Sequence, residues 1–166
     1  SSQKFEREVI EYFAPLYDYD LNNVWGIVTH SGTDGNNHGI YFGAKMLYNT
    51  TGISPVLYVS DEAHYSNMRL ADLQNLDMKL IKSDEMGRMI PEELEKALDP
   101  SRPVLMVYAM GSNLKGAIDN MEELNAILDK HSEIPAVYRH LDAALFGGYL
   151  PFSQYKDMVS HKKQRF

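Results

Sequence analysis

The feature that most constrains the fold of this chain is a regular alternation of short apolar runs with segments of helical pattern. The apolar runs are residues 24–29, 55–60, 78–83, 103–110 and 135–142. They are mostly apolar rather than regularly alternating, which is typical of strands buried on both faces. Helical patterns lie between them, and this order favours right-handed crossovers. The sequence therefore predicts an α/β domain with a mostly parallel sheet flanked by helices.

The 166 residues are enough for one domain, so we treat 1–166 as a single unit. Residues 1–20 form a leading segment in which apolar side chains recur at helical spacing, with Ser2 as a possible cap. Pro15 is expected to end or kink that helix. The alternating core spans 24–142, and 153–166 follow as a tail.

Composition excludes several classes of protein. The net charge of −7 argues against a nucleic-acid groove, which needs clustered Lys and Arg. The basic cluster at 161–165 is expected to be a solvated segment. No apolar run is long enough to cross a membrane. Cysteine is absent, which excludes thiol chemistry and fits a reducing compartment. We expect a cytoplasmic protein that binds neither nucleic acid nor membrane.

Four polar segments follow apolar runs, at the sheet edge where α/β proteins bind ligands. They are SGTDGN (31–36), DEAHYS (61–66), GSNLKGAIDN (111–120) and HLDAALFGGYLPF (140–152). The first opens a helix, whose N–H groups suit an anion such as phosphate, and its glycines permit close approach. The alternative is an ordinary helix cap formed by Thr33 or Asp34.

The other three segments each offer one notable side chain. His64 could stack on a flat ligand or act in acid/base chemistry, or it could simply satisfy its own backbone. Lys115 invites a catalytic interpretation, although an exposed loop lysine is usually solvated. Asp142 ends an apolar strand, where a desolvated carboxylate needs a cationic or protonated partner. The alternative for Asp142 is a cap of the next turn.

Several other site types are not indicated. His30 and His38 are eight positions apart, which is not a usual metal-ligand spacing, and HExxH is absent. We expect no metal. The GxSxG hydrolase motif, the P-loop lysine motif and the GxGxxG dinucleotide motif are also absent.

In their order and spacing, the four polar segments resemble the pyridoxal-phosphate-dependent group II amino-acid decarboxylases of fold type I, most of all the bacterial histidine decarboxylases. The resemblance covers about Phe5 to Phe152. It implies pyridoxal 5′-phosphate as the cofactor and part of the family's large domain as the fold. His64 and Asp142 take catalytic roles by this resemblance. The implied cofactor-binding residues are Gly32, Thr33, His64, Ser112, Asp142 and Ala144.

Each of these residues has a role by resemblance. Gly32 and Thr33 hold the phosphate, and His64 stacks on the pyridine ring near the substrate carboxylate. Asp142 pairs with the protonated ring nitrogen, which makes the ring an electron sink. Ala144 lies against the other face of the ring, and Ser112 stands where the family usually has threonine.

Two departures from the family pattern stand out. Asn113 replaces the second threonine of a Gly-Thr-Thr run, so its contacts differ from those of the family. The family forms its Schiff base with lysine in a Ser-x-His-Lys segment, and Ser160-His161-Lys162 lacks the spacer residue. The true segment is expected just past Phe166. We therefore expect a truncated large domain that lacks the Schiff-base lysine and is inactive in isolation.

The resemblance implies decarboxylation of an amino acid, with L-histidine giving histamine and CO₂ as the best single assignment. Glutamate, serine and aromatic amino acids stay open as substrates. Another fold type I enzyme, an aminotransferase or a lyase, is an alternative. A different class of alternative is a non-catalytic binding or scaffold fragment. The full-length enzyme is expected to be a homodimer.

Overall fold

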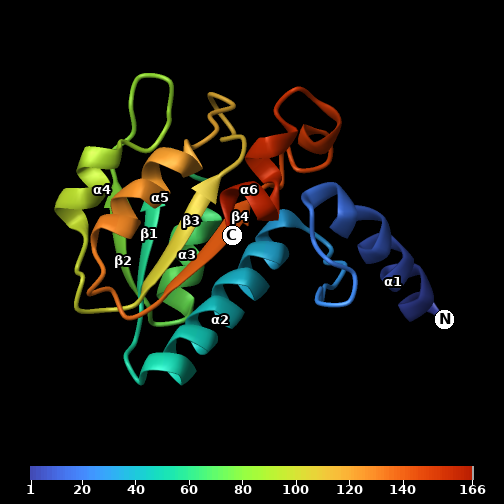
Figure 1. Ribbon diagram of the computed structural model, residues 1–166, viewed down its shortest axis with the longest axis horizontal. Helices are drawn as coiled ribbons and strands as arrows, with labels where there is room; N and C mark the ends of the chain where they lie inside the picture. The colour runs from blue at the N-terminus through green and yellow to red at the C-terminus, as the bar shows by residue number, and fades with distance from the viewer. Residues whose placement is uncertain (166) are drawn as a thin grey trace.

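The computed structural model describes residues 1–165 and contains one parallel four-stranded sheet. The strand order is β2-β1-β3-β4, and each neighbouring pair is parallel (Figure 1). This confirms the predicted α/β class. The strands are β1 (Val56–Ser60), β2 (Asp77–Ile81), β3 (Val104–Ala109) and β4 (Val137–Asp142).

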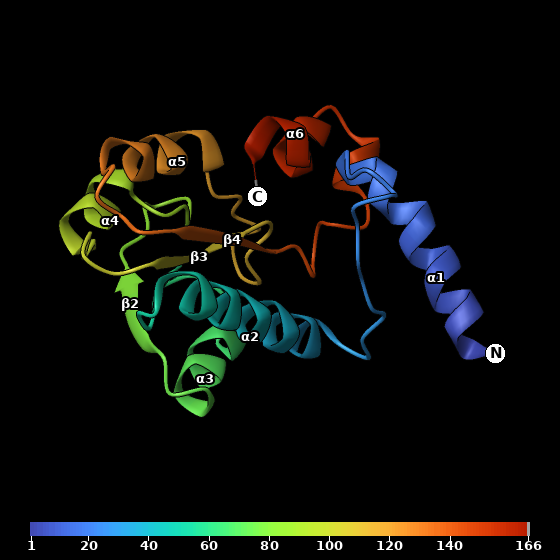
Figure 2. The same ribbon diagram turned by 60° about the horizontal axis from the view of Figure 1, so that its bottom comes forward.

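Helices cover both faces of the sheet. On one face lie α2 (Gly32–Thr51) and α3 (Ser66–Leu73), and on the other lie α4 (Pro91–Ala97) and α5 (Met121–Lys130) (Figure 2). Pro91 stands at the first turn of α4, where its missing N–H costs no hydrogen bond. The helix patterns of the sequence are thus confirmed for all four of these helices.

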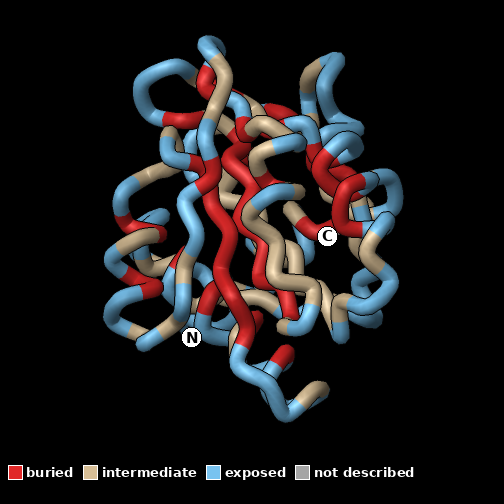
Figure 3. Tube along the Cα trace, turned by 90° about the vertical axis from the view of Figure 1, so that its left-hand side faces the viewer, coloured by how far each residue is buried: buried red, intermediate tan, exposed pale blue. Residues whose placement is uncertain are grey.

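The core is built on the two central strands, β1 and β3, which are buried along their whole length (Figure 3). Successive side chains alternate between the two faces: Tyr58 and Tyr108 pack toward α4 and α5, whereas Leu57 and Val107 pack toward α2 and α3. Burial on both faces was predicted for every strand. The prediction is wrong for β2 and β4, which are the outer strands of the described sheet and are more exposed.

The leading segment forms α1 (Ser2–Phe13) and a 3-10 turn, η1 (Ala14–Tyr17). The helix ends just before Pro15, as predicted. The position ahead of the helix is Ser1 rather than Ser2, and it makes no side-chain capping bond. No residue of α1 is buried, and Figure 1 shows this helix to one side of the sheet. The segment joins the domain through Tyr17, whose hydroxyl donates to the Gly147 carbonyl at 2.6 Å.

The predicted strand at 24–29 is wrong. Residues 24–29 form neither a helix nor a strand, and they do not pair with the sheet found among residues 1–165. The Val28 N–H donates to the Glu6 carboxylate at 2.8 Å, and Gly26 lies against Ile10. The segment therefore packs against α1 instead of pairing with a strand. Trp25 and Val28 are exposed. An apolar run without a neighbouring strand to complete its hydrogen bonds does not form a ladder.

After β4 the chain forms two 3-10 turns, η2 (Leu150–Phe152) and η3 (Lys156–Val159), and a short helix, α6 (His161–Gln164). Ser160 caps α6 by accepting from the Lys163 N–H at 3.2 Å, and Val159 is fully buried. The basic cluster predicted as a solvated segment therefore contains a capped helix, and Arg165 pairs with Asp129 at 2.8 Å. Within residues 1–165, no helix combines the length and apolarity needed to cross a bilayer.

Candidate active site

A cavity of about 210 Å³ opens at the carboxyl ends of the strands. The start of α2 and the loops that follow β1, β3 and β4 all contribute to it, as expected for a parallel sheet. All six residues that the sequence assigned to a cofactor line this cavity. The full lining is Ser31, Gly32, Thr33, Asn36, His64, Ala109, Gly111, Ser112, Asn113, Asp142, Ala144 and Leu145.

The N-terminus of α2 forms one wall. Ser31 caps the helix, because its hydroxyl accepts from the Asp34 N–H at 3.2 Å. The predicted alternative, a cap by Thr33 or Asp34, is therefore wrong. The Gly32 and Thr33 N–H groups have no hydrogen-bond partner within residues 1–165. Free N–H groups at the start of a long helix are a site for an anion.

Gly32 also meets the opposite wall at close range. A Cβ atom added at Gly32 would lie 2.7 Å from the Cβ of Ala144, in the loop after β4. Only glycine at position 32 and a small side chain at position 144 permit this approach. The close contact brings the helix start and the loop after β4 together at one side of the cavity.

His64 lies in the loop between β1 and α3 and is half-buried. Its Nδ1 accepts from the Ser66 N–H at 3.2 Å and lies 2.7 Å from the Ser66 hydroxyl. Because Nδ1 is an acceptor, the proton of the neutral ring is at Nε2. The local contact matches the alternative in which His64 satisfies its own backbone, yet the ring also lines the cavity.

The loop after β3 forms a tight turn that holds Ser112. The Ser112 N–H donates to the Ala117 carbonyl at 3.0 Å, and its hydroxyl accepts from the Ala117 N–H at 3.1 Å. Gly111 precedes it at φ +106°, where other residues are strained, and a Cβ there would meet the Phe146 ring at 2.7 Å. Lys115 of the same loop is paired with Glu62 at 2.9 Å and lies outside the cavity.

Asp142 is the last residue of β4 and supplies a carboxylate to the cavity. Its Oδ2 accepts from Asn36 Nδ2 at 2.9 Å and from Asn67 Nδ2 at 3.0 Å. Its other oxygen, Oδ1, has no partner among residues 1–165. The carboxylate is thus held by two helices on one side and can accept a hydrogen bond on the other.

His140 lies two residues before Asp142 on the same face of β4, and its Nε2 is 2.9 Å from Asn36 Oδ1. Burial lowers the pKa of His140, and the charge of Asp142 acts in the opposite direction. The sequence did not single out Asn36, Asn67 or His140 as site residues. The only sequence signal for them was their presence in or beside the four polar segments.

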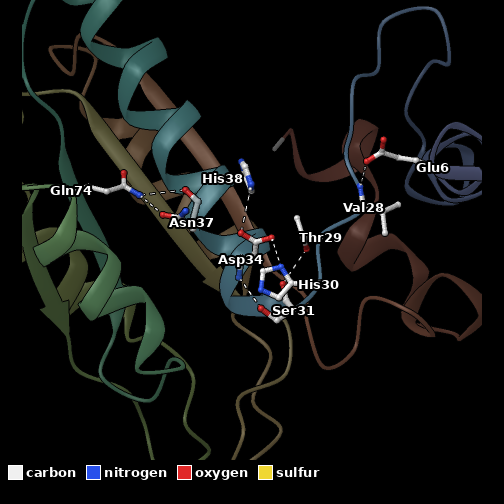
Figure 4. Close-up of polar contacts among 9 residues, drawn as sticks. All are labelled: Glu6, Val28, Thr29, His30, Ser31, Asp34, Asn37, His38 and Gln74. Atoms are coloured by element: carbon white, nitrogen blue, oxygen red, sulfur yellow. Dashed lines mark hydrogen bonds and ion pairs between the residues drawn. The ribbon is translucent and has the colours of Figure 1, made fainter. Parts of the chain in front are cut away.

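His30 and His38 lie outside the cavity. Both rings contact Asp34 on the outer side of α2, with distances of 3.1 Å from His30 and 3.6 Å from His38 (Figure 4). The His30 side chain is 85% exposed. Residues 1–165 contain no cluster of His, Cys, Asp or Glu suited to a metal ion.

The fold and this site together define a parallel α/β domain with free N–H groups at a helix start and a carboxylate at the strand ends. The chain matches the pyridoxal-dependent decarboxylase conserved domain over residues 45–160. It belongs to this family, which confirms the resemblance seen in the sequence.

Particular relatives differ in the substrate that their names state. The chain is 35% identical to histidine decarboxylase from Morganella morganii over 156 residues, or 92% of this chain and 40% of the relative. It is 30% identical to serine decarboxylase 1 from Oryza sativa subsp. japonica over 164 residues, or 98% of this chain and 33% of the relative. The chain thus spans about a third to two fifths of these relatives.

A solved structure supports the fold assignment. The apo form of mouse CSAD superposes with a TM-score of 0.79 at 25% identity, covering 98% of this chain and 36% of that one. The chain thus covers about a third of that structure.

The residues present fit the cofactor that the family name implies. Pyridoxal phosphate carries a phosphate, a flat ring and a ring nitrogen that can be protonated. The cavity offers two free N–H groups at Gly32 and Thr33, and an unpaired carboxylate oxygen at Asp142. The small side chain of Ala144 leaves space beside them.

Proposed function

We propose that this chain is the cofactor-binding part of an amino-acid decarboxylase that uses pyridoxal 5′-phosphate. One observation carries the proposal: the six residues assigned by family resemblance line one cavity, in which Oδ1 of Asp142 has no protein partner. The family match and the decarboxylase names of the relatives support it.

In this proposal the residues of the chain bind, orient and hold a proton. The N–H groups of Gly32 and Thr33 donate to the phosphate at the start of α2. Oδ1 of Asp142 accepts from the ring nitrogen and keeps a proton on it. When bound, the cofactor supplies the electron-withdrawing ring that stabilises the carbanion left by loss of CO₂. His64 would lie against one face of the ring, and the small Ala144 side chain would leave room for the other face.

The test is a binding titration of the chain with pyridoxal 5′-phosphate, followed by absorption and fluorescence. Pyridoxal without the phosphate should bind far more weakly, because the α2 N-terminus then has no anion to hold. Asp142→Asn should lower the affinity on the order of tenfold, since the charged acceptor is lost. Asp77→Asn is the matched control, because Asp77 lies at the start of β2, is paired with Arg102 and does not line the cavity.

A non-catalytic scaffold fragment is the alternative from a different class. It predicts no binding, or binding that Asp142→Asn and Asp77→Asn change equally. Borohydride reduction followed by intact mass gives a second readout. One dominant adduct that is lost on Asp142→Ala would support the proposed site, whereas scattered labelling of surface lysines would leave only noncovalent binding or none, which the titration distinguishes.

L-Histidine is the substrate that we propose first, and serine is the main competitor. Histidine decarboxylases and serine decarboxylases both occur among the relatives, at similar identity. We also propose that the Schiff-base lysine lies beyond Phe166. Amine and CO₂ analysis of the full-length protein with histidine, serine, glutamate and aromatic amino acids decides the substrate. Amino-group transfer without CO₂ release would indicate an aminotransferase instead.

We propose that the complete enzyme is a homodimer, as the family resemblance implies. Large apolar side chains of the N-terminal segment support this proposal, because Phe5, Tyr12 and Trp25 are 68%, 62% and 70% exposed. Exposed apolar groups of this size are often buried by a partner. Light scattering of the full-length protein measures the mass, and a monomer at micromolar concentration would contradict the proposal.

A further inference from the structure

A cluster of buried amides meets the Asp142 carboxylate at a single atom. Asn36 and Asn67 are 5% and 0% exposed, and both donate from Nδ2 to Oδ2 of Asp142. Asn36 comes from α2 and Asn67 from α3, the two helices that cover this face of the sheet. Three elements distant in sequence are thus joined at one carboxylate oxygen.

This arrangement makes the two oxygens of Asp142 inequivalent. An amide N–H can only donate, so Oδ2 accepts both bonds and carries no proton. Oδ1 has no partner within residues 1–165, and the residue lines the cavity. The protein holds one oxygen and leaves the other for a ligand.

The Asp142 carboxylate fixes the orientation of the Asn36 amide, because it can accept a hydrogen bond only from Nδ2. Asn36 Oδ1 then faces His140 Nε2 at 2.9 Å, and it can accept a hydrogen bond from a neutral ring that carries its hydrogen at Nε2. Burial lowers the pKa of His140, which keeps the ring neutral with that single N–H. A reversed amide would place NH₂ against the ring N–H and its oxygen against the carboxylate.

Asn67 gives an independent observation. Its Nδ2 also donates to the His64 carbonyl at 3.2 Å, whereas its Oδ1 is buried without a partner among the described residues. A buried acceptor without a hydrogen bond costs stability, so packing alone would favour an apolar side chain of similar size. The NH₂ group is therefore the part of the Asn67 amide that makes hydrogen bonds in this structure.

We propose that Asn36 and Asn67 are positioning residues that hold Oδ2 of Asp142 so that Oδ1 is presented to the ring nitrogen of the cofactor. His140 acts through Asn36 by fixing its amide. This inference rests on the proposed function, because it assigns the ligand of Oδ1. Holding the carboxylate before binding lowers the cost of ordering it when the cofactor arrives.

The experiment compares two ligands that differ at one ring atom. Pyridoxal 5′-phosphate is titrated against its deaza analogue, in which carbon replaces the ring nitrogen. The chain, Asn36→Leu and Asn67→Leu are measured side by side. Asn125→Leu is the matched control: Asn125 is also a buried asparagine, but it bonds Tyr108 and Arg139 on the opposite face of the sheet.

The unsubstituted chain should prefer the cofactor over the deaza analogue. That preference should fall on the order of tenfold in Asn36→Leu and Asn67→Leu and stay unchanged in Asn125→Leu. Thermal unfolding checks that the variants fold. Asn125→Leu and Asn67→Leu should both lose stability, because each removes buried hydrogen bonds, and the loss in Asn67→Leu should be the smaller one because the unpaired buried acceptor Oδ1 is removed with them.

The possible failures are separable. If both leucine variants keep the full preference while Asp142→Asn loses it, the positioning role is overturned and the proposed function stands. If the unsubstituted chain binds both ligands equally or binds neither, the proposed function fails, and the positioning role fails with it.

Discussion

Asp119 is a buried carboxylate that binds backbone N–H groups near the carboxyl ends of the strands and does not line the cavity. Its oxygens accept from the Met89 and Ala109 N–H groups, each at 2.8 Å. Burial raises its pKa to about 6, although the backbone hydrogen bonds act in the opposite direction. The residue thus ties the end of β3 to the loop before α4.

The raised pKa predicts a pH dependence of stability. The folded state binds this proton more tightly than the unfolded chain, so the contribution is present in acid and is lost as the pH rises through about 6. The loss is about 2 kcal/mol in free energy of unfolding between pH 4 and 7. Asp119→Asn removes the titrating group. The free energy of unfolding of the variant should therefore rise relative to that of the unsubstituted chain as the pH rises.

Urea unfolding of both proteins at several pH values measures this difference, and all other titrating groups cancel in the comparison. A stability difference that is constant from pH 4 to 7, or that moves in the opposite direction, would contradict the assignment.

The histidine beside the site gives a second residue-scale prediction. The neutral ring of His140 should carry its proton at Nε2, because Asn36 Oδ1 accepts from it. Nitrogen NMR of the imidazole distinguishes the two tautomers. In Asn36→Leu the Nε2 proton should exchange faster with solvent, and a ring found with its proton at Nδ1 would exclude the proposed amide orientation.

At the scale of elements, the long helix α2 approaches β4 through its glycines. A Cβ added at Gly39 would lie 2.4 Å from the His140 ring, and one added at Gly43 would lie 2.5 Å from the Tyr138 ring. These glycines give up helix propensity. In return, α2 lies close enough to β4 for Asn36 to reach Asp142.

Two alanine substitutions in this one helix separate propensity from packing. Gly35→Ala should raise stability by about 1 kcal/mol, because the nearest atom to the new Cβ is 3.5 Å away. Gly39→Ala gains the same propensity, but its overlap with the buried ring should cost about 1–3 kcal/mol or more. Denaturant unfolding of both variants gives the values, and equal changes would mean that α2 can move away freely.

The elements also show what the sequence can predict and what it cannot. Four of the five apolar runs form strands. Continuous apolar character reports burial for β1 and β3, whereas the runs of β2 and β4 contain charged residues and are more exposed. The run at 24–29 is equally apolar, but a strand forms only where an adjacent strand completes its hydrogen bonds. A local sequence pattern does not show which segments will be adjacent. The six assigned site residues converge since they follow strand ends. The Asn36–Asp142 and Asn67–Asp142 bonds span 106 and 75 positions, which no local pattern indicates.

At the scale of the whole molecule, stability is concentrated in the centre of the sheet. β1 and β3 are buried along their length and have a strand on each side. The outer strand β2 is mostly exposed, and α1 has no buried residue. The cavity lies at the ends of β1, β3 and β4, so its floor is held by the most buried part of the chain.

This distribution predicts an order of amide hydrogen exchange. Amides of α1 should exchange first, because opening this helix exposes little apolar surface. Amides of β2 should follow, and those of β1 and β3 should exchange only on global unfolding. Pyridoxal 5′-phosphate at one hundred times its dissociation constant should raise the opening free energy of the β1 and β3 amides by about 2.7 kcal/mol and so slow their exchange. The α1 amides should not respond, because local opening there leaves the cavity intact. Mass spectrometry after timed exchange measures both effects, and uniform protection across α1, β2 and β3 would contradict this account.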